Sequence, residues 1–245
     1  MAESNARQVV YTHEARCRDC YRCVRVCPIK AIRIDDGQAF VDPERCISCG
    51  TCVRECPQGA KAFRRDLDKA EELVARHAFV AVSLAPSFAG VFEPWQYARI
   101  PSALRALGFE YVAETAVGAY LVAQRTASCA EDAPRISICT ACPAVVTYVE
   151  KYEPDKIGNL LPVVSPMIAH ARHIREKFGT EAKVVFIGPC VAKKTEAERP
   201  EFKGLVDCGL TFDELEEWLK RKHIDLARCE DSTFDEEPEG KSRLF

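Results

Sequence analysis

The chain lacks any apolar run long enough to span a lipid bilayer. Its longest weakly polar stretch, Ala78 to Phe92, is short and is interrupted by serine, proline and glycine. The opening residues, Met1 to Arg7, are polar, so we expect no secretion signal and a cytoplasmic protein. Lys and Arg number 34 against 37 Asp and Glu, so the strong positive charge typical of nucleic-acid-binding proteins is also missing. We therefore expect neither a membrane nor a nucleic acid as a partner.

Cysteine, in contrast, is abundant, with 14 in 245 residues. Disulfides rarely persist in the reducing cytoplasm, so this number predicts metal or redox chemistry. Eight of these cysteines form two copies of one spacing, offset by 29 residues. The copies are Cys17-x2-Cys20-x2-Cys23-x3-Cys27-Pro28 and Cys46-x2-Cys49-x2-Cys52-x3-Cys56-Pro57. This spacing is typical of bacterial ferredoxins that hold two 4Fe-4S clusters.

The spacing also predicts how the eight cysteines divide between the clusters. The first three cysteines of a copy bind one cluster, and the fourth, which lies next to proline, binds the other. The predicted ligand sets are Cys17, Cys20, Cys23 and Cys56 for the first cluster and Cys46, Cys49, Cys52 and Cys27 for the second. Zinc sites instead use two separated Cys-x2-Cys pairs with a long spacer, which these cysteines do not form.

A hairpin is expected between the two cysteine copies. Residues Ala31 to Ile34 alternate as a strand does, Asp36-Gly37 supplies a tight turn, and Gln38 to Val41 returns. We therefore predict a ferredoxin-like α+β domain with two 4Fe-4S clusters over residues 1–65.

Arginines flank the ligand cysteines, and their role has two interpretations. They are Arg16, Arg18, Arg22, Arg25, Arg45 and Arg54. Positive charge near a cluster offsets its negative charge and raises its reduction potential. Alternatively, these side chains simply face solvent. The residue pattern favours neither interpretation.

After Arg65 the hydrophobic pattern changes. Residues 66–79 predict a linker helix, and beyond it strand-like runs alternate with helical ones. The predicted strands are Phe79 to Leu84, Ile136 to Ile138 and Lys183 to Ile187, and the predicted helices are Ser102 to Leu107, Val145 to Tyr152, Pro166 to Phe178 and Phe212 to Lys222. This alternation predicts an α/β domain with a mainly parallel sheet over residues 80–245.

Further cysteines follow two of the predicted strands. Cys139 and Cys142 follow one, and Cys190 follows another. Ligands of parallel sheets bind beyond the carboxyl ends of the strands, so a second metal site is one interpretation. Another is that these cysteines pack as small buried hydrophobic residues. Cys139-x2-Cys142 could also be a redox dithiol, although it lacks a clear helix N-terminal setting.

Several segments resemble the signature loops of the iron-iron hydrogenases. They are Thr140 to Val146, Ser165 to Met167 and Gly188 to Glu196, supported by Ala85 to Ser87 and Val149 to Pro154. The resemblance covers nearly the whole chain. It implies a two-cluster ferredoxin domain that feeds a catalytic cluster, a third 4Fe-4S cubane joined to a di-iron centre with carbon monoxide and cyanide ligands. By resemblance, Cys142 and Cys190 are two of the four cubane ligands, Lys193 hydrogen-bonds a cyanide, and Glu196 belongs to the neighbouring polar network.

The chain also departs from that family. The third signature loop, which supplies the other two cubane ligands, does not follow the last predicted helix, and neither Cys208 nor Cys229 has its glycine-rich pattern. The proton-relaying cysteine of the family is Ala141 here, and its methionine is Gly188. These changes resemble the sensory branch of the family, in which signalling modules follow the hydrogenase part.

Three functions are compatible with these residues. The first is an iron-sulfur electron-transfer protein, part of a hydrogenase-like protein that senses hydrogen or redox state, whose two 4Fe-4S clusters relay electrons to a hydrogenase-type site. The second is an active hydrogenase whose third loop comes from elsewhere. The third is a redox-sensing interaction module without turnover. We favour the first, expect this chain alone to be inactive as a hydrogenase, and expect a redox partner protein and a downstream signalling domain as partners.

Overall fold

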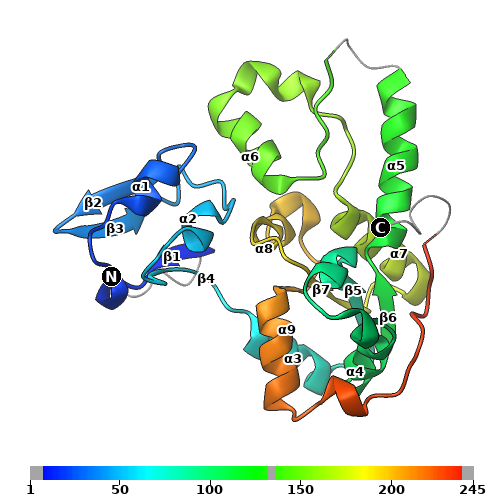
Figure 1. Ribbon diagram of the computed structural model, residues 1–245. Coiled ribbons are helices and arrows are strands. Elements are labelled where there is room, and N and C mark those ends of the chain that lie inside the picture. The colour runs from blue at the N-terminus through cyan, green and yellow to red at the C-terminus, as the bar shows by residue number, and fades with distance from the viewer. Residues whose placement is uncertain (1–7, 132–135, 239–245) are drawn as a thin grey trace. The chain divides into compact units, whose positions relative to one another are not determined.

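The computed structural model describes residues 8–131 and 136–238, which form two compact units (Figure 1). The polar opening Met1 to Arg7 lies outside the described residues. The first unit combines Met1–Arg64 with two later segments, Pro143–Ile157 and Cys190–Thr195. The second unit contains the rest of the chain. None of the helices in the described part is both long and apolar enough to cross a bilayer.

The first unit contains two antiparallel strand pairs. Strand β1 (Val10–Thr12) pairs with β4 (Lys61–Phe63), and β2 (Ile32–Asp35) pairs with β3 (Gln38–Val41). Asp35 lies opposite Gln38 across the Asp36-Gly37 turn, so the predicted hairpin is confirmed. The helices of this unit are α1 (Arg22–Val26), α2 (Thr51–Arg54) and α6 (Pro143–Tyr152).

The backbone of the first unit repeats with the same 29-residue offset as its cysteines. Three pairs of equivalent positions have left-handed φ angles, a conformation that residues other than glycine rarely adopt. The pairs are Asp19 and Ser48 (φ 52° and 55°), Tyr21 and Gly50 (56° and 75°), and Lys30 and Gly59 (51° and 57°). The two cysteine segments therefore share one backbone shape as well as one spacing.

The second unit is built on a four-stranded sheet. The strand order is β6-β5-β7-β8, and every pairing in it is parallel, as the alternating pattern predicted. The strands are β5 (Val80–Leu84), β6 (Tyr111–Glu114), β7 (Lys183–Ile187) and β8 (Cys208–Leu210). All five residues of β5 are buried, because helices cover parallel sheets on both faces.

Helices connect and cover these strands. Those that lie in or reach into the second unit are α3 (Leu67–Arg76), α4 (Ile100–Ala106), α5 (Ala116–Glu131), α7 (Pro166–Phe178), α8 (Ala192–Ala197) and α9 (Phe212–Arg221). Short 3-10 helices occur at Glu14–Arg16, Pro86–Gly90, Pro94–Arg99, Pro154–Asn159, Pro200–Phe202 and Leu226–Arg228. The C-terminal segment, red in Figure 1, runs beside the sheet edge, where Glu236 forms a parallel bridge with Ala113 of β6.

The expected strand at Ile136 to Ile138 is wrong. Ile138 forms one isolated bridge with Leu160, and Ile136 is 70% exposed. Three apolar residues are too few to distinguish a buried strand from a loop, and no neighbouring strand of the sheet pairs with them in the described part of the chain. Cys139 and Cys142 therefore follow a loop, and both are exposed.

Helices α5 and α7 pack closely because Gly118 has no side chain. A Cβ atom at this position would lie 2.2 Å from the carbonyl oxygen of Pro166 and 2.7 Å from Cβ of His170. We expect Gly118→Ala to lower the free energy of unfolding of the second unit by about 3 kcal/mol, since the helices must separate. Gly158→Ala is the control, because no atom lies within 4 Å of its added Cβ. Urea denaturation should distinguish the two variants, and equal stabilities would contradict this packing.

Candidate iron-sulfur site

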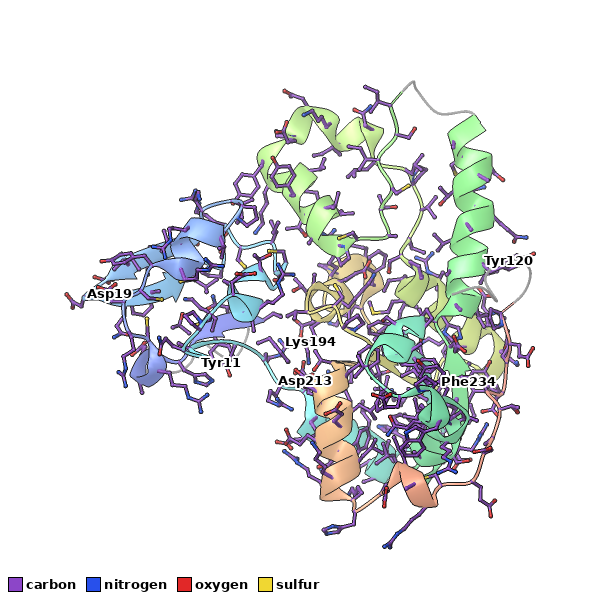
Figure 2. The ribbon with its side chains drawn as sticks, in the orientation of Figure 1. Tyr11, Asp19, Tyr120, Lys194, Asp213 and Phe234 are labelled. Carbon is purple, nitrogen blue, oxygen red and sulfur yellow. The ribbon has the colours of Figure 1, made fainter. Side chains whose placement is uncertain are left out.

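The structure brings the N-terminal cysteines together in two groups. The thiol of Cys23 lies close enough to those of Cys17 and Cys56 for their charges to interact. The thiol of Cys52 lies within range of three others, Cys46, Cys49 and Cys27. Cys20 is exposed on the loop between Cys17 and Cys23. Figure 2 shows sulfur atoms in yellow among the strands and helices of this unit.

Burial within each group follows the repeat. The third cysteine of each triplet, Cys23 or Cys52, is buried, whereas the second, Cys20 or Cys49, is exposed. Burial raises the pKa of the Cys52 thiol to about 12 and also raises the pKa of Cys23. Metal binding requires thiolates, so a cluster must displace these protons, and its affinity then depends on pH.

Backbone N–H groups point at several of the sulfur atoms. Ala31 donates to Sγ of Cys27 at 3.3 Å, and Ala60 donates to Sγ of Cys56 at 3.3 Å, again 29 residues apart. Ser48 donates to Sγ of Cys46 at 3.3 Å. Burial raises the pKa of Cys56, but the N–H groups of its loop outweigh burial and hold that pKa below its usual value. Such donors stabilise thiolate sulfur and tune iron-sulfur clusters.

Helix α6 holds the loop that carries the second group of cysteines. The ammonium of Lys151 donates to the carbonyl oxygen of Glu44 at 2.7 Å and to that of Cys46 at 3.1 Å. The Tyr152 hydroxyl donates to the carbonyl oxygen of Arg45 at 2.7 Å. The end of α6 therefore fixes three consecutive carbonyl groups, the last of which belongs to Cys46, the first ligand candidate of that copy.

The segment Cys190–Thr195 also packs against this loop. The hydroxyl of Thr195 donates to that of Ser48 at 3.1 Å, and Val191 packs against the apolar core of the first unit. A Cβ atom added to Gly50 would lie 3.7 Å from the side chain of Val191. The loop between Cys46 and Cys52 is thus enclosed by two segments far away in the sequence.

Lys61 is a functional candidate that the sequence reasoning missed. Its side chain is 3% exposed, and its ammonium donates to the carbonyl oxygen of Ala39 at 2.7 Å and to the hydroxyl of Thr12. Cysteines of both groups lie within its electrostatic range, among them Cys23 and Cys52. The repeat contained a signal, because the offset of 29 residues pairs Lys61 with the apolar Ile32.

The donor set fits clusters better than a single ion. Among the described residues, no three His, Cys, Asp or Glu side chains are arranged to hold one metal ion. The four thiolates of a cubane bind four separate iron atoms, so they stand farther apart than the ligands of one ion. All-cysteine sets with N–H donors to sulfur match this arrangement.

The other predicted site residues lie outside the two groups. Cys142 is exposed and directly precedes α6, and Cys190 is half-buried and begins the segment that packs with the first unit. Lys193 and Glu196 are both buried. The hydroxyl of Ser165 donates to Oε2 of Glu196 at 3.0 Å, which fixes that carboxylate at the N-terminus of α7.

Comparison with known proteins identifies relatives of both parts. The 4Fe-4S dicluster domain matches residues 16–60. NADP-reducing hydrogenase subunit HndD of Solidesulfovibrio fructosivorans is 31% identical over 89% of this chain and 38% of its own length. The periplasmic Fe hydrogenase large subunit of Nitratidesulfovibrio vulgaris is 28% identical over 96% of this chain and 63% of its own. Cytosolic Fe-S cluster assembly factor NAR1 of Vanderwaltozyma polyspora is 36% identical over 36% of this chain and 17% of its own.

Solved structures lead to the same family. An FeFe-hydrogenase superposes with a TM-score of 0.59 at 25% identity, over 71% of this chain and 51% of the other. A variant of FeFe-hydrogenase HydA1 from Chlamydomonas reinhardtii superposes with a TM-score of 0.58 at 24% identity and shares the fold. The chain spans less than two thirds of the length of these relatives. Residues 78–245 match the C-terminal domain of the iron-only hydrogenase large subunit, and the chain therefore belongs to that family.

Proposed function

We propose that this protein transfers electrons through two 4Fe-4S clusters, bound in a ferredoxin-like first unit, toward a hydrogenase-type site. The observation that carries the proposal is the separation of the N-terminal thiols into two groups, each with one thiol from the other copy of the repeat. Cys17, Cys20, Cys23 and Cys56 would hold one cluster, and Cys46, Cys49, Cys52 and Cys27 the other. When bound, such clusters accept and release single electrons.

The exposed cysteines support a transfer role. Cys20 and Cys49 are both exposed, so a cluster at each group would lie near the surface of the unit. Electron transfer between proteins requires such access, whereas a purely structural cluster does not. We propose that a redox partner protein docks over the loop that contains Cys20, and that the relay operates in the cytoplasm.

The packing around the second group suggests the direction of the relay. The loop between Cys46 and Cys52 contacts the segment that begins at Cys190, through the Thr195–Ser48 hydrogen bond and the side chain of Val191 beside Gly50. We propose that electrons enter at the first cluster and leave from the second. The sensing role implied by Ala141 and Gly188 remains part of this proposal.

A third cluster would use the residues of the signature loops. Cys142 and Cys190 would be two of its thiolate ligands, with Lys193 and Glu196 as the polar residues beside it. A cubane joined to a di-iron centre needs further thiolates, so loading depends on ligands beyond these two. The buried carboxylate of Glu196 and the buried ammonium of Lys193 would orient groups at that centre.

We expect anaerobically reconstituted protein to contain about eight iron and eight sulfide per chain from the two N-terminal clusters. Cys20→Ala and Cys49→Ala should each reduce iron to about four per chain, because each removes one ligand of one cluster. Iron and sulfide assays with electron paramagnetic resonance (EPR) of the reduced protein provide the measurement.

The matched control is Cys229→Ala, because Cys229 belongs to the second unit and to neither predicted ligand set. This variant should keep the iron and the EPR spectrum of the parent. If Cys20→Ala retains full iron and an unchanged spectrum, the ligand assignment is wrong.

A further inference from the structure

We propose that the buried ammonium of Lys61 lies between the two clusters and raises the reduction potentials of both. This inference rests on the proposed function, because it requires clusters at the two groups of cysteines. It assigns Lys61 as a positioning and tuning residue, not as a ligand.

The internal repeat shows that Lys61 replaces an apolar core residue. The segments Cys27-Pro28-Ile29-Lys30-Ala31-Ile32 and Cys56-Pro57-Gln58-Gly59-Ala60-Lys61 are equivalent. Ile32 and Lys61 begin β2 and β4, and both are buried, at 7% and 3% exposure. Packing at this position is therefore satisfied by an apolar side chain, and burying a charge there is costly unless the charge is paired.

Two hydrogen bonds hold the ammonium inside the unit. It donates to the carbonyl oxygen of Ala39 in β3 and to the hydroxyl of Thr12, which lies opposite Lys61 in the β1–β4 pair. Thr12 in turn donates to the same Ala39 carbonyl at 2.5 Å. An ammonium has three N–H donors, so one remains after these two acceptors.

The negative charge that would pair with Lys61 comes from both cysteine groups. Cys17, Cys23 and Cys56 of the first group and Cys52 of the second lie within its electrostatic range. Four thiolates outweigh the positive charge of an oxidised cubane, so each loaded site is negative. The clusters would therefore keep Lys61 charged, although burial alone lowers its pKa.

The same charge affects cluster reduction. One electron from an external reductant adds one negative charge to a cluster and leaves its iron-sulfur and iron-thiolate bonds intact. A nearby buried cation stabilises the reduced form more than the oxidised form, because the Coulomb attraction grows with the cluster charge. Since thiols of both groups interact electrostatically with Lys61, we expect both potentials to depend on it.

The flanking arginines do not provide an equivalent charge. Arg16, Arg18, Arg22, Arg25, Arg45 and Arg54 are all exposed. Water and salt screen exposed charges, so their effect on a cluster is small. Within residues 8–64, Lys61 is the only lysine or arginine that is buried. Within this segment we therefore expect Lys61, and not the six flanking arginines, to be the main tuning charge.

The test is an EPR-monitored redox titration of the full reconstituted chain with dithionite and mediators. In Lys61→Met we expect the reduction equilibrium constant of both clusters to fall at least about tenfold, which is about 59 mV for a one-electron couple. Lys61→Gln should shift both clusters similarly, because it keeps an N–H donor for Ala39 but removes the charge. Lys61→Arg should restore potentials close to those of the parent.

Lys30→Met is the matched control, because it removes one exposed lysine from the same unit. It should change either equilibrium constant by less than about twofold. Unchanged potentials in Lys61→Met and Lys61→Gln with full iron content would overturn the inference. So would loss of the clusters in both neutral variants with retention in Lys61→Arg, because the charge would then be needed to hold the clusters. Low iron in the parent protein would instead contradict the proposed function.

Discussion

Removal of iron from the protein is expected to unfold the first unit while the parallel sheet of the second unit keeps its fold. Among the described residues of the first unit, the apolar core cluster contains 11 buried residues, and three of these are cysteines. The core cluster of the second unit contains 33 buried residues in the described part of the chain. A core this small rarely stabilises a domain without metals or disulfides, so cluster binding should supply much of the folding free energy.

Backbone strain adds to this dependence. Asp19, Tyr21 and Ser48 adopt left-handed φ angles between the ligand candidates, and each such residue costs about 1–3 kcal/mol. Cluster ligation would hold these loops in place, and without it the loops are free to relax. Helix α6 belongs to the same unit, so it should lose its order together with β2 and β3.

Hydrogen exchange before and after anaerobic chelation measures the effect. We expect amide protection in β2 and β3 to fall at least about a thousandfold, equivalent to about 4 kcal/mol. Protection in β5 and β7 of the same sample serves as the internal control and should change little. Reconstitution with iron and sulfide should restore the lost protection. An equal loss in both units would contradict the dependence of the first unit on its clusters.

Elements with a strong local pattern could be predicted from the sequence. Helix α7 has the predicted bounds, Pro166 to Phe178, and α9 begins at the predicted residue Phe212, after a capping box of Thr211 and Glu214. In that box the backbone N–H of Thr211 donates to Glu214 at 2.8 Å. Helix caps and amphipathic periodicity depend on residues within one or two turns, so they can be predicted without knowledge of the tertiary structure.

Elements whose partners are distant in the chain could not be predicted in this way. Strands β6 and β8 were missed, and β8 has only three residues, Cys208–Leu210, with a glycine at its centre. It forms because β7 offers a parallel edge, not because of its own composition. Conversely, Ile136 to Ile138 has a strand-like composition but no sheet edge to join in the described part of the chain. Strand formation depends mainly on the neighbouring strand and on burial.

The candidate site shows the same division. Cysteine spacing predicts two ligand sets, because three ligands of each set lie within a single short loop. The enclosure of the second loop by α6 and Cys190–Thr195 could not be predicted, since it joins residues about a hundred positions apart, such as Lys151 and Glu44. The unusual position of Lys61 could have been recognised from the sequence, but only by comparing the two repeat copies position by position.

The environment of His170 also depends on distant residues, and it makes the stability of the second unit depend on pH. The structure shows that the side chain of His170 is packed in the interior, with no exposed surface. The hydroxyl of Ser83 lies 2.8 Å from Nδ1 of His170 and 2.7 Å from the hydroxyl of Thr115. Nε2 of His170 has no hydrogen-bond partner within the described part of the chain.

The stability of the second unit is therefore expected to fall with pH below about 6.5. Burial, helped by His173 and Lys177 and opposed by Glu236, lowers the pKa of His170 to about 3. The unfolded chain binds a proton at this residue near its ordinary pKa of 6.5, whereas the folded chain does not. The free energy of unfolding therefore does not depend on His170 titration above about pH 6.5. Between about pH 6.5 and about pH 3 it falls by about 1.4 kcal/mol per pH unit.

Between about pH 7.5 and about pH 4.5 the expected loss from His170 is about 2.5 kcal/mol. Burial raises the pKa of Glu114 in β6, so this carboxyl group acts in the opposite direction in the same window. Protonation of Glu236 in acid also destabilises the protein. Because the pKa of Glu236 is lowered from 4.5 to about 2, that loss occurs mainly below this window. Hydrogen exchange of the β5 and α7 amides, measured across this pH range, gives the change in the free energy of unfolding per pH unit. His170→Gln should remove most of the slope whatever its absolute stability, because a glutamine does not titrate. His173→Gln should keep the slope, because His170 stays buried, and a slope in His170→Gln equal to that of the parent would show that another group causes the acid sensitivity.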